Sequence, residues 1–170
     1  MLPTKISLIG MPSAGKTTIS KKLAALIDYK SIDLDHMVEE KENKSLISIL
    51  EDKGSQYFLD MEYGFLKNLQ ENETIVIGTA GSIIYHEEAM KWLKSNTKII
   101  FIDTDLEIIK DRLSKKPKAV VGLKEKGLDV LWEERLPVYR KWADIEITTQ
   151  GKSIEQIVSE IQEKITSLPQ

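Results

Sequence analysis

Residues 10–17 read GMPSAGKT, and this stretch decides how the rest of the sequence is interpreted. It matches the complete pattern G-x-x-x-x-G-K-[ST], in which backbone N–H groups of a small-residue loop surround phosphate groups. The N-terminus of the helix that follows such a loop adds positive potential. Lys16 can reach the terminal phosphates, and the Thr17 hydroxyl is placed to ligate Mg²⁺. The stretch therefore predicts that the chain binds a nucleotide through its phosphates.

The residues on either side of this loop fit a strand, a turn and a helix. Residues 5–9 read KISLI, which is short, apolar and β-branched, as a buried strand should be. Residues 17–27 carry apolar side chains at helical spacing. Gly10 and Gly15 stand where the backbone turns sharply or approaches a ligand. The alternative is an ordinary Gly-Pro turn, which does not require Gly, Gly, Lys and Thr at these spacings.

Strands and helices alternate along the whole chain. The strands expected after the first cover residues 29–33, 74–77, 98–102 and 146–148. Such alternation predicts an α/β fold with three layers, α/β/α, around a parallel five-stranded sheet, as in P-loop NTPases. Ligands of such sheets collect at the carboxyl ends of the strands, where the loop over residues 78–82 should join the phosphate loop.

Local signals mark several helix boundaries. Gly54 should separate a helix over residues 45–53 from one that starts at Ser55 and runs to about residue 70. A helix from about residue 128 to 141 should contain Pro137 near its end. Two capping-box patterns are expected to start later helices, namely Thr104 with Glu107 and Ser153 with Gln156.

Residues 114–127 interrupt this rhythm. They read SKKPKAVVGLKEKG, with five lysines, one proline and two glycines. We interpret them as a mobile loop or lid within a single domain that spans residues 1–170. A solvated surface connection is the alternative, because lysine-rich loops are common on protein surfaces.

Composition places the chain among ordinary globular proteins. It has 170 residues, 41% of them hydrophobic and 30% charged, with a formal net charge of −3. This charge gives no reason to expect a nucleic-acid partner. The chain has no cysteine, no signal-peptide pattern and no apolar run of the roughly 20 residues that a membrane helix needs. We expect a cytoplasmic monomer that acts on a small molecule and has no membrane partner.

Two aspartates end the second expected strand. If Asp33 and Asp35 continue its extended geometry, their side chains lie on one face. One carboxylate near Mg²⁺ can hold the metal, and a second can accept a proton from an acceptor hydroxyl or orient it. We assign Asp33 to the metal and Asp35 to the acceptor. The alternative, which is not exclusive, is that one of them caps the helix that starts near His36.

Arg112 and Arg135 flank the segment 114–127. Either guanidinium suits bidentate binding of phosphate or carboxylate. Either arginine can equally be a surface residue paired with Asp111 or with the glutamates at 133–134. The two histidines, His36 and His86, are expected to face solvent.

Taken together, these motifs resemble the shikimate kinase family, over nearly the full chain. IDLDHMVEE is similar to the family's FxDxDxxIE, and KSLISILEDKGSQYF to its GxSIxxIFxxxGExxF. VIGTAGS stands in place of the ATGGG loop, and ERLPVYRKWAD resembles RxPLYxxxAD. The phosphate loop is shared by many families, so the D-x-D and R-x-P-x-Y elements narrow the resemblance to this one.

The resemblance implies ATP-dependent phosphorylation of a hydroxyl on a small metabolite, with shikimate as the leading candidate. It implies Lys16 and Asp35 as catalytic residues, and Thr17 and Asp33 on Mg²⁺. The implied ATP site comprises the phosphate loop and one arginine: Gly10, Pro12, Ser13, Ala14, Gly15, Lys16, Thr17, Thr18 and Arg112. The implied acceptor site comprises Asp35, Leu59, Ala80, Gly81 and Arg135.

The departures from the family pattern concern the acceptor. Leu59 stands where the family has an arginine that helps to hold the shikimate carboxylate. The segment 114–127 lacks the family's RPLL element, and either Lys116 or Lys118 is available to replace its charge. Ala80 adds a methyl group to a loop of glycines.

These departures leave two alternative functions open. One is a related kinase for another acceptor, such as a sugar acid, a polyol or a hydroxy amino acid. The other is a nucleotide-binding module without catalysis. A nucleoside-monophosphate kinase fits the D-x-D and R-x-P-x-Y elements less well, and the chain has no N-K-x-D guanine motif of a GTPase.

Overall fold

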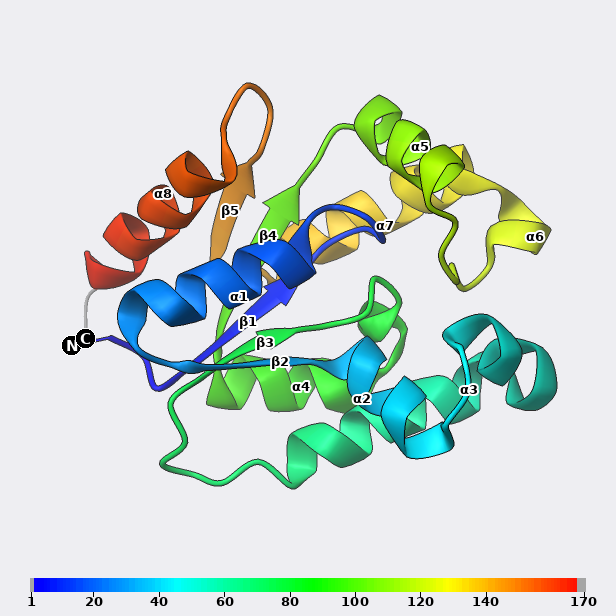
Figure 1. Ribbon diagram of the computed structural model, residues 1–170, viewed down its shortest axis with the longest axis horizontal. Helices are drawn as coiled ribbons and strands as arrows, with labels where there is room; N and C mark the ends of the chain where they lie inside the picture. Colours follow the sequence, from blue (N-terminus) through cyan, green and yellow to red (C-terminus); the bar gives the residue numbers. More distant parts are fainter. Residues whose placement is uncertain (1, 168–170) are drawn as a thin grey trace.

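A computed structural model describes residues 2–167, which form three layers around a central sheet (Figure 1). The strands are β1 (Lys5–Ile9), β2 (Lys30–Asp33), β3 (Ile75–Gly78), β4 (Lys98–Asp103) and β5 (Ile145–Thr148). Their order across the sheet is β2-β3-β1-β4-β5, and every neighbouring pair is parallel. The predicted five-stranded parallel α/β/α fold is confirmed.

The helices follow the expected alternation. They are α1 (Lys16–Ile27), α2 (Leu34–Glu42), α3 (Leu46–Lys67), α4 (Glu87–Asn96), α5 (Leu106–Lys115), α6 (Leu123–Lys126), α7 (Leu128–Trp142) and α8 (Ile154–Thr166), with a 3₁₀ helix η1 (Ile83–Tyr85). Gly54 bends α3 sharply, with φ 81° and ψ 171°, so the expected break is confirmed. Among the described residues, no helix is long and apolar enough to cross a membrane.

One of the two expected capping boxes is present. Ser153 and Gln156 bond reciprocally at the start of α8. The box expected at Thr104 is wrong, because Asp105 caps α5 instead and accepts from the Glu107 N–H at 2.9 Å. The segment 114–127 is likewise not all loop, since it contains the last turn of α5 and the short helix α6.

Alternate side chains of each strand enter different layers, as the pleat requires. On one face, Leu8 belongs to a core cluster with residues of α1 and α8. On the other, its neighbour Ile9 belongs to a cluster with residues of α3, α4 and α7. Both faces of the sheet are therefore covered, which is the usual condition for a parallel sheet.

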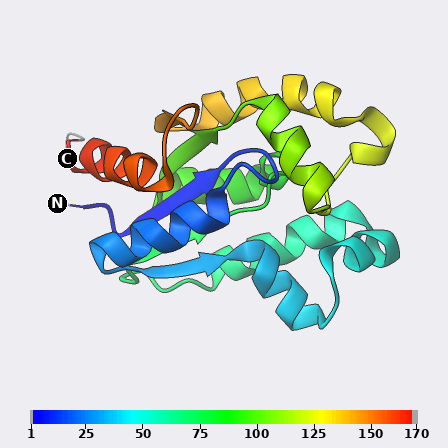
Figure 2. The same cartoon turned by 45° about the horizontal axis from the view of Figure 1, so that its top comes forward.

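The end of the sheet away from the chain termini carries the remaining helices. Figures 1 and 2 show α2, the first half of α3 and α6 at this end, beyond the carboxyl ends of the strands. A third, smaller apolar cluster lies there, with Val38 of α2, Ile49, Phe58 and Leu59 of α3, and Ala80.

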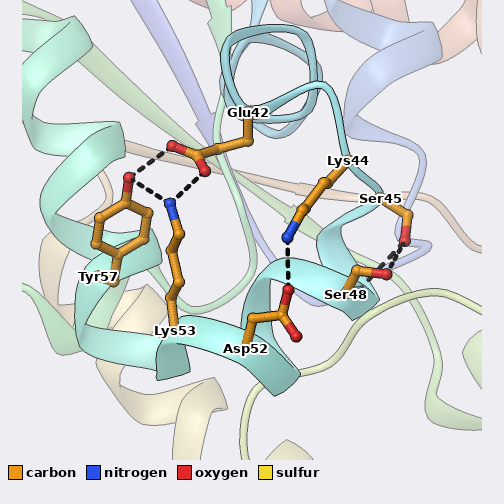
Figure 3. Close-up of polar contacts among 7 residues, drawn as sticks. All are labelled: Glu42, Lys44, Ser45, Ser48, Asp52, Lys53 and Tyr57. Atoms are coloured by element: carbon orange, nitrogen blue, oxygen red, sulfur yellow. Dashed lines mark hydrogen bonds and ion pairs between the residues drawn. The ribbon is translucent and has the colours of Figure 1, made fainter.

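Polar contacts hold α2 against the start of α3 (Figure 3). Glu42 accepts from Lys53 Nζ and from the Tyr57 hydroxyl, both at 2.5 Å. Lys44 Nζ lies 2.7 Å from Asp52 Oδ2. These bonds hold in place the part of α3 that carries Phe58 and Leu59.

Candidate active site

The phosphate loop leaves β1 at Gly10 and ends at the first residue of α1. Gly10 has φ +148°, and a Cβ there would lie 2.7 Å from the Ile102 carbonyl oxygen. Gly15 has φ +105°, so both positions need glycine for backbone reasons. The buried Lys16 Nζ donates to the carbonyls of Gly10 and Met11, each at 2.7 Å. These two bonds hold the Lys16 side chain back against the start of the loop.

Asp33 joins the loop to the end of β2. Thr17 Oγ1 donates to Asp33 Oδ2 at 2.5 Å, and Asp33 Oδ1 accepts from the His36 N–H at 3.2 Å. The aspartate therefore caps α2, as the alternative reading expected, and also contacts the phosphate loop, where its assignment to Mg²⁺ stays a prediction. A hydroxyl and a carboxylate at this distance are hard oxygen donors of the kind that Mg²⁺ prefers.

Asp35 lies at the same site, but it stands on a helix and not on the extended strand that was expected. The extended geometry does not continue, because α2 begins at Leu34 and Asp35 lies in its first turn. Its Oδ1 is out of contact with solvent and has no hydrogen-bond partner among the described residues. Burial, and then the charge of Asp33, raise the pKa of Asp35 to about 7.

The lysine and the aspartate influence each other electrostatically. Burial lowers the pKa of Lys16 to about 8, and the negative charge of Asp35 opposes this shift. Lys118 acts on both groups, since its positive charge lowers the pKa of Lys16 and that of Asp35. Of the two lysines that the sequence left open, Lys118 is the one whose charge acts on the centre of the site.

A cavity, here called the phosphate cavity, runs along the loop. It is lined by Pro12, Ser13, Gly15, Lys16, Thr17, Thr18, Asp35, Thr79, Gly81, Arg112, Lys115, Lys116, Lys118 and Ile154. Arg112 Nη1 donates to the Ser13 carbonyl at 2.9 Å, so this arginine lies against the loop rather than against an acid. Positive side chains from α1, from α5 and from the residues that follow α5 surround the cavity, which suits an anionic ligand.

A second cavity, here called the Arg135 cavity, adjoins the first. Its lining is Pro12, Asp35, Leu46, Leu50, Phe58, Ala80, Gly81, Ser82, Ala119, Val121 and Arg135. Arg135 is fully buried on α7, and the glutamates at 133–134 do not pair with it. Its Nη1 has no partner among the described residues. Asp35 and Arg135 are the charged residues of this lining, and the remaining lining residues apart from Ser82 are apolar or glycine.

Gly81 lies where the two cavities meet. A Cβ on Gly81 would lie 2.6 Å from Pro12 Cδ, so the two loops are in direct contact there. The Tyr139 hydroxyl donates to the Gly81 carbonyl at 2.6 Å and so holds the 78–82 loop in place. Ala80 lines the Arg135 cavity, with its methyl group in the third apolar cluster.

Leu59 differs from the other predicted acceptor residues. Within the described part of the chain it is not among the residues that line either cavity, and it packs in the third apolar cluster at 4% exposure. Glu62, one turn further along α3, is a residue that sequence reasoning missed. It is fully buried, its Oε1 accepts from the Ala80 N–H at 3.1 Å, and its Oε2 is unpartnered. Burial, and then the charge of Asp35, raise the pKa of Glu62.

The expectation for the histidines is half right. His36 is exposed, with 68% of its side chain accessible. His86 is not solvent-facing, because its side chain is 11% exposed and caps α4 by accepting from the Ala89 N–H. Its Nε2 lies 3.1 Å from Asp60 Oδ1. This histidine therefore has a structural role at the start of α4.

A third cavity, also missed from the sequence, adjoins the phosphate cavity on the far side of Arg112. It is lined by Ala14, Ile19, Ile108, Arg112, Thr149, Gly151, Lys152, Ile154 and Ile157. The Thr149 hydroxyl lies 2.8 Å from that of Thr104, which itself donates to the Ala14 carbonyl at 2.9 Å. The turn after β5 is thereby tied to the phosphate loop. The three cavities together form one continuous region along the carboxyl edge of the sheet.

Comparison with known proteins identifies the family. The family model for shikimate kinase matches residues 12–166. A shikimate kinase of Clostridium botulinum is 37% identical and covers 96% of this chain and 98% of its own length. The chain belongs to the shikimate kinase family. The resemblance noted in the sequence is thus confirmed, and with it an ATP-dependent phosphotransferase that acts on a hydroxyl.

Solved structures agree with this assignment. The shikimate kinase of Acinetobacter baumannii, determined in complex with shikimate, has a TM-score of 0.87 and 29% identity and covers 98% of this chain and 94% of its own. The shikimate kinase of Aquifex aeolicus has a TM-score of 0.79 and 34% identity and covers 95% and 96% of the two chains. The arrangement of helices around the sheet is therefore that of shikimate kinases over nearly the whole length.

Proposed function

We propose that this kinase transfers the terminal phosphoryl group of ATP to a hydroxyl of shikimate, giving shikimate 3-phosphate and ADP. The observation that carries the proposal is a pair of unpartnered polar atoms on the Arg135 cavity, Asp35 Oδ1 and Arg135 Nη1. A buried polar group without a partner is costly, so a ligand that completes its bonds is favoured. An acceptor with a hydroxyl for Asp35 and a carboxylate for Arg135 meets both needs.

ATP is assigned to the two cavities on the other side of Gly81. The backbone of residues 10–18, with Lys16 and Arg112, would bind its phosphates, and the third cavity, which Thr149 lines, would receive the base. Thr17 and Asp33 would hold Mg²⁺, whose charge neutralises phosphate oxygens when it is bound. The described residues hold no group of three or more His, Asp or Glu side chains that could bind a metal. This fits a metal held by few side chains together with the phosphates themselves.

Because the Arg135 cavity adjoins the phosphate cavity, an acceptor hydroxyl in the first would lie next to the terminal phosphate of ATP in the second. The acceptor oxygen forms its bond to the terminal phosphorus while the bond to the ADP oxygen breaks, and the hydroxyl proton passes to ionised Asp35. Lys16 and Lys118 stabilise the negative charge that spreads over the phosphoryl oxygens. We further propose that the segment 114–127 is a lid, because Lys118, Ala119 and Val121 line the cavities. A closed lid excludes water from the transferred group.

A steady-state assay of ADP release tests the proposal across shikimate, quinate, sugar acids, polyols and hydroxy amino acids. We expect shikimate to give the highest kcat/KM. Replacing Arg135 by Lys should raise the shikimate KM by about 10²-fold, because a lysine replaces a bidentate guanidinium poorly, and should leave the ATP KM unchanged. Tight ATP binding without turnover of any acceptor would contradict the proposal and favour a non-catalytic module.

A second candidate acceptor class is favoured by Leu59. A buried leucine at this position leaves Arg135 as the one cation on the Arg135 cavity among the described residues. An acceptor that carries less negative charge than shikimate, such as a polyol, suits a cavity with a single guanidinium. A polyol that exceeds shikimate in kcat/KM in the same panel would select this candidate.

A further inference from the structure

Arg135 is connected to the segment 114–127 as well as to the acceptor cavity. Its Nη2 donates to the Val121 carbonyl at 2.6 Å, and its Nε donates to the Tyr85 hydroxyl at 3.2 Å. No carboxylate pairs with it in the part of the chain that the structure describes. The direction in which the free Nη1 points is therefore set by two neutral oxygen atoms.

Tyr85 is an unusual partner for this guanidinium. It ends η1, and 42% of the residue is exposed, so its ring is not needed to fill the core. The Arg135 Cζ atom lies 5.1 Å from the centre of the ring. The hydroxyl that accepts from Arg135 also donates to Glu134 Oε1 at 2.7 Å. This second bond fixes the hydroxyl so that its lone pairs face the arginine.

Glu134 leads back to the segment 114–127 by a second path. Its Oε2 lies 2.6 Å from Lys126 Nζ, at the end of α6. Val121 and Lys126 thus both connect this segment to Arg135, one directly and one through Glu134 and Tyr85. The position of the segment and the position of the guanidinium depend on each other.

We propose that Tyr85 is the positioning residue that aims Arg135 at the acceptor and couples acceptor binding to closure of the segment 114–127. The proposal rests on the proposed function, which assigns Arg135 to an anionic group of the acceptor. An anion on Nη1 holds the guanidinium in the orientation in which Nη2 also binds the Val121 carbonyl. The acceptor alone, without nucleotide, should therefore order the segment.

Tyr85→Phe tests the positioning role because it removes the hydroxyl and keeps the exposed ring. We expect the acceptor KM to rise about tenfold while the ATP KM stays at its original value. Tyr29→Phe is the matched control, since its hydroxyl makes one bond, to the Pro3 carbonyl at 3.1 Å, near the start of the chain. A change in Tyr85→Phe no larger than in Tyr29→Phe, or an equal rise in both KM values, would overturn the positioning role.

Hydrogen exchange tests the coupling. The amides of Leu123, Lys126 and Gly127 are bonded within the segment and report its order. Shikimate without nucleotide should slow their exchange in the original protein and in Tyr29→Phe, and slow it less in Tyr85→Phe. Lys126→Met, which removes the ion pair with Glu134 on the surface, should lose part of the effect. Equal slowing in all four proteins would overturn the coupling.

Failure of the proposed function gives a different result. If no acceptor is turned over, the ligand-free proteins still differ, because Tyr85 and Val121 hold Arg135 in the absence of ligand. Faster exchange of the three amides in ligand-free Tyr85→Phe than in ligand-free Tyr29→Phe would then support the link between Tyr85 and the segment. Equal exchange in the two ligand-free variants would reject that link.

Discussion

The phosphate cavity and the Arg135 cavity adjoin each other, yet they are built differently. The first takes six of its fourteen lining residues, Lys16 among them, from one continuous stretch of sequence, residues 12–18. The second collects single side chains from α2, α3, the 78–82 loop, the segment 114–127 and α7. A local motif thus forms much of the proposed donor side, whereas the proposed acceptor side depends on how distant elements pack. Substitutions on the donor side should accordingly abolish most of the activity, whereas substitutions on the acceptor side should change it in smaller steps.

Lys16→Met should have the largest effect. It roughly keeps the length of the side chain but removes the charge that the carbonyls of Gly10 and Met11 hold at the phosphate loop. We expect kcat/KM to fall by at least about 10³-fold, measured as ADP release. Lys22→Met, on the same helix, removes an exposed lysine that pairs with Glu155 and should leave the rate unchanged. Appreciable turnover by Lys16→Met would show that the donor side does not depend on this charge.

Asp35→Asn should impair the acceptor side of the site and leave ATP binding on the donor side unchanged. It removes the proton acceptor, so kcat should fall by about 10²- to 10³-fold while the affinity for ATP stays the same. Asp52→Asn, at an exposed position that pairs with Lys44, is the control. A parallel loss of ATP affinity, measured by titration with a fluorescent nucleotide, would mean that Asp35 belongs to the donor side instead.

The same variant should be more stable than the original protein at high pH. A carboxyl whose pKa rises on folding from 3.8 to about 7 binds its proton more tightly in the folded state. Its contribution to stability is therefore present at low pH and is lost as pH rises through that range. At pH 8 we expect Asp35→Asn to gain about 1–3 kcal/mol, or roughly 2–10 °C in Tm, and at pH 4 to gain little. Thermal unfolding at both pH values measures the difference.

The pH dependence of kcat/KM for the acceptor should reflect the ionisation of both Asp35 and Lys16. Below about pH 7 the rate should fall tenfold per unit, because protonated Asp35 does not accept the hydroxyl proton. Above about pH 8 it should fall again as Lys16 loses its charge. Saturating ATP should move the upper limb to higher pH, since phosphate stabilises the protonated lysine. A lower limb that survives in Asp35→Asn would assign it to another group.

Leu59→Arg should have the smallest effect of these variants, and it tests the acceptor side of the site. It places a guanidinium three residues before the buried Glu62, whose Oε2 has no hydrogen-bond partner among the described residues. The added charge should lower the shikimate KM by roughly threefold to tenfold. Leu59→Met, which adds no charge, should not lower it. Equal KM values for the two variants, with both folded, would mean that the missing arginine does not limit shikimate binding.

The fold could be predicted from the sequence because its signals are local. All five strands were predicted, four of them from stretches rich in β-branched residues, and the glycine spacing of residues 10–17 predicted the phosphate loop. Thr104 shows where local reading fails, since its hydroxyl donates to the Ala14 carbonyl and Asp105 caps α5 instead. The capping pattern was present, but a contact 90 residues away in sequence used the side chain for another purpose.

The acceptor side was predicted less completely for the same reason. Asp35 and Arg135 were found through their motifs, and both line the Arg135 cavity. Glu62 was missed because a glutamate on an amphipathic helix is usually exposed. Only the packing of α3 against the 78–82 loop turns it inward, where it accepts from the Ala80 N–H. Tyr85 was missed because a lone tyrosine after a loop has no pattern of its own.

The contact between Gly81 and Pro12 limits how this kinase can evolve. Any side chain at Gly81 would collide with the loop that binds phosphate, so a mutation there alters the donor side together with the acceptor side. Selection for a new substrate is thus unable to act through Gly81 alone. Ala80 and Leu59 do not line the phosphate cavity, and changes there should spare the phosphate loop. Among kinases of this fold, we therefore expect Gly81 to vary less than Ala80 and Leu59.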